Sequence, residues 1–261
     1  MSPATPPAPA LPTRRLLAAY GLETRLELVR LMRTPAFALP MFLLPAATYL
    51  LFAFAVGGEM VAKDPDAGRF MFAGFSVMAV TMAALFATCP NLALEREQGL
   101  LTLRRAQPAP PGAWLAAKVV AGVACGALAY LPILLLGGLT GQAHLTTAQL
   151  AAMSAVLVAG TIPFCALGLM LGTLTSGSAA PAYANLVYLP GLYLSGVFFP
   201  LPKSMHFQVG FWPHFHLDQL AFAAGGVAKF RWIAPQMAFS VLLGLTVLCS
   251  GIALWRLSRR G

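Results

Sequence analysis

Long apolar runs alternate with short polar segments along the chain after residue 34. A helix needs about 20 apolar residues to cross the hydrocarbon core of a bilayer. Runs in this range occupy 37–56, 70–90, 113–137, 149–174, 182–200 and 233–255. They lack the apolar and polar alternation of barrel strands, so their backbone groups are expected to bond within helices. The pattern predicts an all-α integral membrane protein with six transmembrane helices.

A different pattern precedes the first run. Between 13 and 34, the apolar residues Leu22, Leu26 and Val29 fall on one helical face, with charged residues roughly 100° away. This spacing predicts an amphipathic helix on the inner membrane surface, and the alternative is an extension of the first span into the cytoplasm. Residues 1–12 are rich in Pro and Ala and predict a disordered tail. The six-span domain is then expected to cover 35–261.

Composition and charge support the membrane interpretation. Hydrophobic residues make up 59% of the chain and charged residues 10%, against about 25% charged in soluble domains. The net charge of +9 would suggest nucleic acid in a soluble chain, but its distribution follows the positive-inside rule. We expect a multi-pass protein of the cell (inner or plasma) membrane with both termini in the cytoplasm. In this orientation the outer segments hold only five of the 17 basic residues: Lys63, Arg69, Lys203, Lys229 and Arg231. The basic residues are therefore expected to lie against a lipid bilayer, and no binding of nucleic acid is expected.

One cytoplasmic segment, 91–111, combines charges with aliphatic residues. Gly99 is expected to break the helix that continues the second span, and Leu100 begins a second short helix that the Pro cluster at 108–111 ends. The result is a hairpin of about 20 residues. Its leucines can insert into a groove of a partner protein, and its charges can fix the orientation of that partner. We expect the hairpin to bind a partner through Glu95, Arg96, Glu97, Gly99, Leu101, Arg104 and Arg105. The alternative is that its charges merely follow the positive-inside rule.

The outer segment before the last run is rich in aromatic residues and prolines. It predicts a re-entrant hairpin in the outer leaflet, since irregular backbone at that depth must be covered by protein or line a water-filled cavity. Its marker residues are Ser195, Gly196, Phe199, Pro200, Pro213 and Asp218. His214, His216 and Asp218 could form a metal or proton site, but no further ligand is near in sequence, so an interfacial cluster without metal is expected.

These two segments resemble the ABC-2-type permease family of ATP-binding-cassette exporters. Glu95, Arg96, Glu97 and Gly99 match the family's Glu-Arg-Glu-x-Gly sequence, and the run from Ser195 to Pro200 with the later 213–219 segment resembles its outer region. The chain departs from the pattern in Ala117 before Lys118 and in the doubled Pro110 and Pro111. The resemblance implies a six-span subunit with an interfacial N-terminal helix, a second permease in a homodimer, and a separate ABC ATPase on the cytoplasmic loops.

The residues are consistent with that division of labour. The chain has no GxxxxGK[ST] motif to cradle phosphates, so ATP and Mg are expected on the partner, with no catalytic residue and no cofactor in this chain. The middle of each span lacks ionisable residues, which proton-coupled carriers need. The expected function is the permease subunit of an ABC exporter. Its path would be formed by the first, second and fifth spans and would suit a lipophilic or amphipathic substrate, such as a drug, lipid-like molecule or peptide.

Three alternatives belong to other classes. A secondary carrier or channel would need a polar filter within the spans, and an intramembrane enzyme would need a nucleophile with His or clustered carboxylates. The four histidines lie outside the spans and the chain has eight acidic residues, which disfavours both. A non-transporting membrane anchor or sensor that binds the same ATPase stays open.

Overall fold

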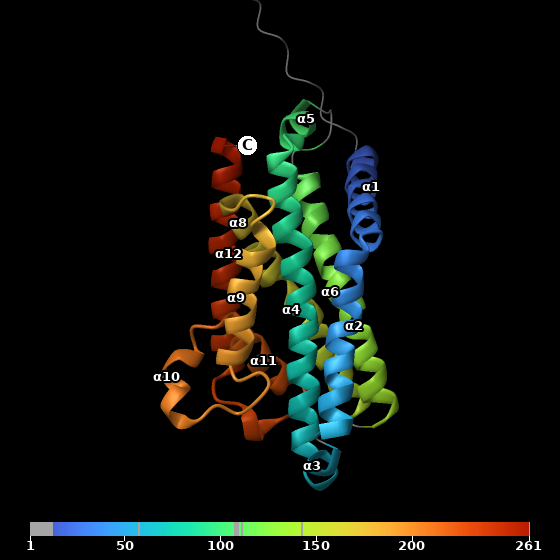
Figure 1. Cartoon of the computed structure of the whole chain (residues 1–261), viewed down its shortest axis with the longest axis vertical. Coiled ribbons are helices and arrows are strands. Elements are labelled where there is room, and N and C mark those ends of the chain that lie inside the picture. The colour runs from blue at the N-terminus through green and yellow to red at the C-terminus, as the bar shows by residue number, and fades with distance from the viewer. Residues whose placement is uncertain (1–12, 57, 107–109, 111, 142, 261) are drawn as a thin grey trace, which may run out of the picture.

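The computed structural model describes residues 13–56, 58–106, 110, 112–141 and 143–260, and the predicted tail, 1–12, lies outside them. The described chain is helical, with short turns and no strand. Figure 1 shows an elongated bundle with α1, α5 and the end of α12 at one end, and α3, α10 and α11 at the other. We call these the α5 end and the α11 end.

The elements are α1 (Thr13–Met32), α2 (Pro35–Leu50), the π-helix η1 (Leu51–Val56), α3 (Gly58–Lys63), α4 (Pro65–Glu97), α5 (Leu100–Ala106), α6 (Ala113–Leu139), α7 (Thr147–Ala159), α8 (Thr161–Leu174), α9 (Ala180–Leu194), η2 (Lys203–Met205), α10 (His206–Val209), α11 (Pro213–Ala224), η3 (Ala228–Phe230) and α12 (Pro235–Arg260).

Five helices among the described residues are long and apolar enough to cross a membrane: Pro35–Ala55, Pro65–Glu97, Ala113–Leu139, Thr147–Leu174 and Pro235–Arg259. They contain five of the six predicted runs almost entirely. The fourth is built from α7 and α8 in succession. Apolar run length was therefore a sufficient signal for these helices.

The predicted fifth span, 182–200, is not confirmed. Its helix, α9, ends at Leu194 and has 15 residues, about 22 Å at 1.5 Å per residue, which is short of a hydrocarbon core of about 30 Å. The helix stops because Gly196 adopts φ +80°, a left-handed conformation that ends helices. The chain then rests on α4, where a Cβ at Gly74 would lie 2.2 Å from the carbonyl oxygen of Val197.

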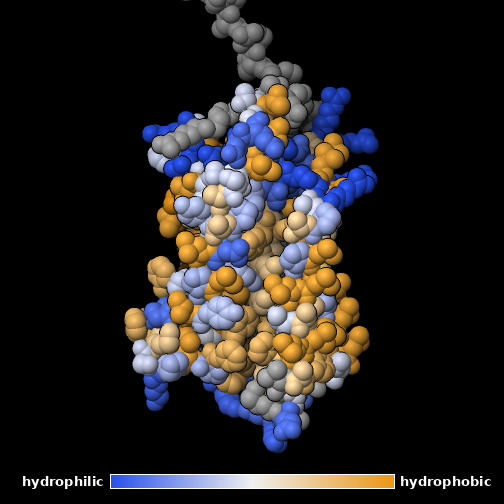
Figure 2. Space-filling view, in the orientation of Figure 1, coloured by the Kyte–Doolittle hydropathy of each residue, from blue (hydrophilic) through white to orange (hydrophobic). Residues whose placement is uncertain are grey.

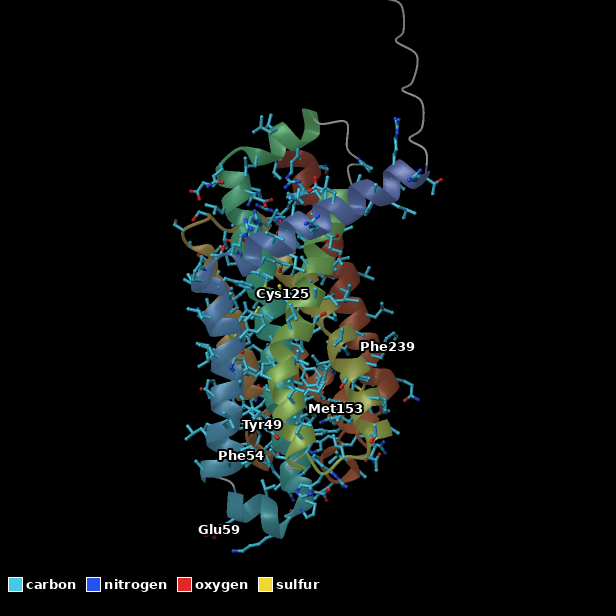
Figure 3. The ribbon with its side chains drawn as sticks, turned by 90° about the vertical axis from the view of Figure 1, so that its right-hand side faces the viewer. Tyr49, Phe54, Glu59, Cys125, Met153 and Phe239 are labelled. Atoms are coloured by element: carbon cyan, nitrogen blue, oxygen red, sulfur yellow. The ribbon has the colours of Figure 1, made fainter. Side chains whose placement is uncertain are left out.

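Helix α4 is the centre of the bundle. In its most apolar window 83% of the residues are buried within the protein, whereas the corresponding figure is 22% for both α2 with η1 and α12. Those two segments lie at the periphery, and their outward apolar side chains, such as Phe239 on α12 (Figure 3), are suited to lipid. Figure 2 shows an apolar middle and a concentration of hydrophilic residues at the α5 end.

Small residues allow the central helices to approach closely. A Cβ at Gly122 on α6 would lie 2.6 Å from Sγ of Cys165 on α8, and one at Gly168 would lie 2.0 Å from Oγ1 of Thr88 on α4. Both glycines belong to small-xxx-small patterns, which permit close helix packing in membranes. These patterns allow close packing of α6, α8 and α4 within one chain.

Helix α1 lies across the α5 end at a steep angle to the bundle (Figure 3). Its bounds fall within the predicted 13–34. Leu22, Leu26 and Val29 are exposed on its outer face, while Glu27 and Leu31 are buried against the bundle. The helix therefore presents leucines outward and hides a charge, which is the reverse of a helix on a soluble protein.

Candidate functional site

The first part of the predicted hairpin, the turn from α4 into α5, is present at the α5 end, whereas residues 107–109 and 111 of its expected Pro turn lie outside the described residues. Helix α4 stops at Glu97, and Gly99 adopts φ +70°, which allows the chain to turn directly into α5. The predicted break at Gly99 and the second short helix are confirmed by this geometry. The hairpin is thus two helices joined by a glycine turn, positioned by the long central helix.

Glu95 is the buried centre of the site. One of its oxygens, Oε1, accepts a hydrogen bond from Nζ of Lys118 on α6 at 2.9 Å and another from the guanidinium of Arg30 on α1. The other oxygen, Oε2, accepts from the indole N–H of Trp114 at 2.9 Å. One carboxylate from α4 therefore holds side chains of α1 and α6.

Glu27 completes the cluster from α1. Its Oε1 accepts from Lys118 Nζ at 2.9 Å and from Arg30 at 2.7 Å. Lys118 is fully buried, and among the described residues its ion pairs are those with these two carboxylates. The four ionised groups, Glu27, Arg30, Glu95 and Lys118, sum to zero charge, and removing one member of such a buried set costs about 3–5 kcal/mol because the remaining charge is left uncompensated. We call these four residues the α1–α4–α6 junction.

Arg96 and Glu97 join the hairpin to the turn between α8 and α9. Arg96 donates to the carbonyl oxygens of Gly172 at 2.8 Å and Thr175 at 3.4 Å, and Glu97 accepts from the N–H of Gly177 at 2.9 Å. The last carbonyls of a helix have no partner within it, and a cation at that end also favours the helix dipole. The hairpin and α8 are therefore fixed to each other by charge-assisted hydrogen bonds.

Helix α5 has one buried and one exposed side. Leu101 is buried in a small apolar cluster with Leu92, Leu169, Ala253 and Leu257. Arg104 forms an ion pair with Glu23 of α1 at 2.8 Å and lies 5.6 Å from the centre of the Trp114 ring. Leu103, in contrast, is 63% exposed. The side chain of Arg105 is outside the described residues.

A cavity of about 260 Å³ opens between the hairpin and the α8–α9 turn. Its lining combines the two joined segments: Ala93, Arg96, Glu97, Gly99, Leu101, Thr102, Thr175 and Ser176. A side chain from another protein could enter it and contact both segments. Of the residues expected to bind a partner, Arg96, Glu97, Gly99 and Leu101 therefore line one concave surface, whereas Glu95 and Arg104 face other helices of the chain.

The marker residues of the outer segment gather at the α11 end. Pro213 begins α11, and Ser195 and Asp218 are buried, while Phe199 and Pro200 are exposed. Helix α11 contacts α4, α7, α9 and α12 and buries most of its length. Among the described residues, no group of three His, Cys, Asp or Glu side chains is arranged to hold a metal ion.

Comparison with known proteins identifies the family. A sequence model of the ABC-2 type transporter family matches residues 20–217, which include the α1–α4–α6 junction and the cavity lining. The chain belongs to the ABC-2 type transporter family. A protein named "Putative transport permease YvfS" from Bacillus subtilis (strain 168) is 23% identical over 225 residues, covering 84% of this chain and 91% of that protein.

Membership in the ABC-2 type transporter family makes this chain a multi-pass membrane subunit of a transporter. The family is one of permeases and implies an ABC ATPase as the partner. The sequence did not predict the junction, because Glu27, Arg30 and Lys118 were not expected to contact Glu95. The available signal was limited to the i, i+3 spacing of Glu27 and Arg30 on one helix.

Proposed function

We propose that this ABC-2 type permease is the membrane subunit of an ABC exporter whose ATPase docks on the 260 Å³ cavity and on the exposed side of α5. The observation that carries the proposal is the α1–α4–α6 junction directly behind the docking surface. ATP and Mg bind to the ATPase, and this chain converts the movement of that partner into movement of its own helices.

The contacts of the hairpin suit this transmission. A push on α5 reaches α1 through the ion pair between Arg104 and Glu23, and it reaches α4 through the short Gly99 turn. The junction then keeps α1, α4 and α6 together, because separating them would leave charges uncompensated in a buried place. The helices therefore respond as one unit, and coupling requires that the ATPase binds two arrangements of this unit with different affinity.

A larger groove supplies a path for substrate. It has a volume of about 510 Å³ and lies between α2, α4 and α9, mostly lined by apolar side chains. Asn185 and Asn91 add amide groups to this lining. The groove uses residues 36–44 of α2, 82–91 of α4 and 181–189 of α9, so it lies toward the α5 end. An amphipathic substrate would load there from the ATPase side of the membrane, which favours export.

Orientation and assembly follow from the same features. Arginines of α1, α5 and the end of α12, with Arg96 of α4, gather at the α5 end, and the positive-inside rule favours the cytoplasm for this end. A second copy of the permease would cover the groove and the exposed apolar residues Leu39, Leu43 and Leu186 around it. The proposed complex is a homodimer of this chain with two ATPase subunits.

The test uses the full permease, co-expressed with the ABC ATPase that co-purifies with it. Leu103→Asp places a charge on the exposed side of α5, and Leu139→Asp, at an 84% exposed position at the α11 end, is the matched control. We expect Leu103→Asp to lower both co-purification and transport into inverted vesicles at least tenfold, with Leu139→Asp close to wild type. Equal effects of the two variants would contradict docking at α5.

The same preparation separates transport from a membrane-anchor role. In wild type, the ATPase rate should rise with a transported amphipathic compound, and Asn185→Leu should alter which compounds stimulate it. A complex that assembles and hydrolyses ATP but moves no compound from a panel of drugs, lipids and peptides would favour the anchor role.

A further inference from the structure

A small aromatic cavity at the α11 end has no place in the proposed function. Its volume is about 20 Å³, and it lies between the start of α4, the turn after α9, helix α11 and η3. Five aromatic side chains and one carboxyl group dominate its lining: Phe70, Phe215, Phe222, Phe230, Trp232 and Asp218. We call it the Asp218 cavity.

Asp218 is the unsatisfied polar group in this cavity. Its side chain belongs to a residue that is only 3% exposed, and its Oδ1 has no hydrogen-bond partner within the described part of the chain. The other polar groups of the lining are engaged. Gln219 donates to the carbonyl oxygen of Phe230 at 3.1 Å and accepts from the N–H of Trp232 at 2.6 Å, and Ser195 donates to the carbonyl oxygen of Leu192. Burial raises the pKa of Asp218 well above its ordinary value, so the neutral acid is favoured without a cation, and a cation that binds there must displace its proton. A buried oxygen without a hydrogen-bond partner points to a partner supplied from outside.

The aromatic rings are held in mutual contact. The ring centres of Phe70 and Phe230 are 4.8 Å apart, those of Phe70 and Phe222 are 5.7 Å apart, and those of Phe222 and Phe230 are 5.9 Å apart. The two bonds of Gln219 keep the segment carrying Phe230 and Trp232 in place. Aromatic faces attract cations within about 6 Å, so a cavity lined by several rings and a carboxyl group favours a positive ligand.

The basic residues next to the lining aromatics in sequence do not pair with Asp218. Lys229, next to Phe230, donates to Asp64 at 2.7 Å. Arg69, next to Phe70, donates to Asp66 at 3.0 Å and to the carbonyl oxygen of His144 at 2.9 Å. Arg231, between Phe230 and Trp232, is exposed. None of these side chains bonds to Oδ1 of Asp218, so the complementary charge is left to a ligand.

We propose that the Asp218 cavity binds a primary ammonium group, with Asp218 as its counter-ion and hydrogen-bond acceptor and the rings of Phe70, Phe222 and Phe230 around it. Size selects this class, because about 20 Å³ holds a group as large as one water molecule. An –NH₃⁺ group fits, whereas a trimethylammonium group does not. The ammonium can belong to a soluble amine or to an aminophospholipid headgroup, and the chemistry of recognition is the same.

The experiment measures binding of radiolabelled methylammonium to the purified full chain in phosphatidylcholine nanodiscs, which contain no primary amine. We expect saturable binding that unlabelled methylammonium displaces, whereas tetramethylammonium and neutral acetamide do not. Asp218→Asn should weaken binding by about tenfold or more, because the ligand loses a charged acceptor. Glu59→Gln, an exposed carboxyl change at the same end, should leave affinity within about twofold of wild type.

A second variant keeps the test valid if Asp218→Asn fails to fold. Phe230→Leu retains an apolar filling and should weaken binding by about threefold, because one ring face is lost. Binding that survives Asp218→Asn, or that accepts tetramethylammonium equally well, would overturn the proposal. Nanodiscs with phosphatidylethanolamine then identify the source: competition with labelled methylammonium indicates a headgroup ligand, and unchanged binding indicates a soluble amine. The outcome is independent of ATPase docking, since both measurements use the permease alone.

Discussion

The two ends of the bundle differ in how their buried carboxyl groups are bonded. At the α5 end, Glu95 is buried and bonds to Arg30 and Lys118, although Nε of Arg30 is itself buried without a described partner. At the α11 end, Asp218 Oδ1, Nδ1 of His216 and both ring nitrogens of His214 are buried without a described partner. A satisfied buried cluster fixes helices relative to one another. A buried polar group without a hydrogen-bond partner instead indicates either a site for a ligand or a side chain whose role is to fill space between helices.

His214 and Asp218 illustrate these two cases on the same helix. The His214 ring packs between Phe164, at 4.8 Å between ring centres, and Tyr188, at 5.9 Å. A Cβ at Gly191 would lie 2.4 Å from this ring, so the contact leaves no room for a ligand. Asp218, one helical turn later, lines a cavity. His214 therefore acts as a flat spacer between helices, while Asp218 faces space that a ligand can enter.

The largest effect is expected from breaking the satisfied cluster. Lys118→Met removes the buried cation and leaves Glu27 and Glu95 with Arg30 alone, which should destabilise the permease by about 3–5 kcal/mol. Thermal unfolding of the purified chain in detergent measures the loss.

A neutral double variant is the matched control. Lys118→Met combined with Glu27→Gln keeps Glu95 paired with Arg30 and restores the charge balance, so it should recover most of the lost stability. A single variant as stable as wild type would show that the junction contributes nothing to holding α1 in place.

The junction also shows what the sequence could not reveal. The apolar runs predicted six spans, of which five are present as long helices, and Gly99 predicted the break between α4 and α5. The early end of α9 was missed because Gly196 lies inside an otherwise apolar run, and only its positive φ shows that the helix stops there. Glu95 was expected to face a partner because charged residues in short loops are usually exposed. Its burial depends on Arg30 and Trp114, which lie on separate helices, so one-dimensional patterns contain no trace of that contact.

A smaller effect is expected where shape alone matters at the α11 end. Gly191→Ala forces a methyl group against the His214 ring and should cost about 1–3 kcal/mol. Gly251→Ala, on α12 with nothing within 4 Å of the added methyl, is the control and should be neutral or slightly stabilising. Equal unfolding temperatures for the two variants would contradict the tight contact between α9 and α11.

Replacing the His214 ring tests whether the roles of His214 and Asp218 are independent of each other. His214→Phe keeps a flat ring between Phe164 and Tyr188 and removes two unpaired nitrogens, so it should stabilise the permease by about 1 kcal/mol. Methylammonium binding should be unchanged, since the Asp218 cavity lacks His214 among its lining. A destabilised His214→Phe variant would indicate that the ring nitrogens do have a partner, and His214 would then belong with the satisfied groups.

The smallest effect concerns the exposed ion pair that closes the α11 end. The hydrogen bond from Lys229 lowers the pKa of Asp64, and the same bond raises the pKa of Lys229. A lowered carboxyl pKa contributes stability above the ordinary value of about 4, and that contribution disappears as pH falls through the folded-state pKa. The raised Lys229 pKa contributes stability below about pH 10.4, and that contribution is lost at higher pH.

Asp64→Asn should therefore lower the unfolding temperature slightly at pH 7 but not at pH 2.5, and added salt should shrink the difference. Lys63→Met breaks the looser pair with Glu59, whose atoms are 3.6 Å apart, and should change nothing at either pH. Asparagine can keep the hydrogen bond that Oδ1 accepts from the N–H of Asp66, so a difference for Asp64→Asn that persists at pH 2.5 would contradict a role through the charge pair with Lys229.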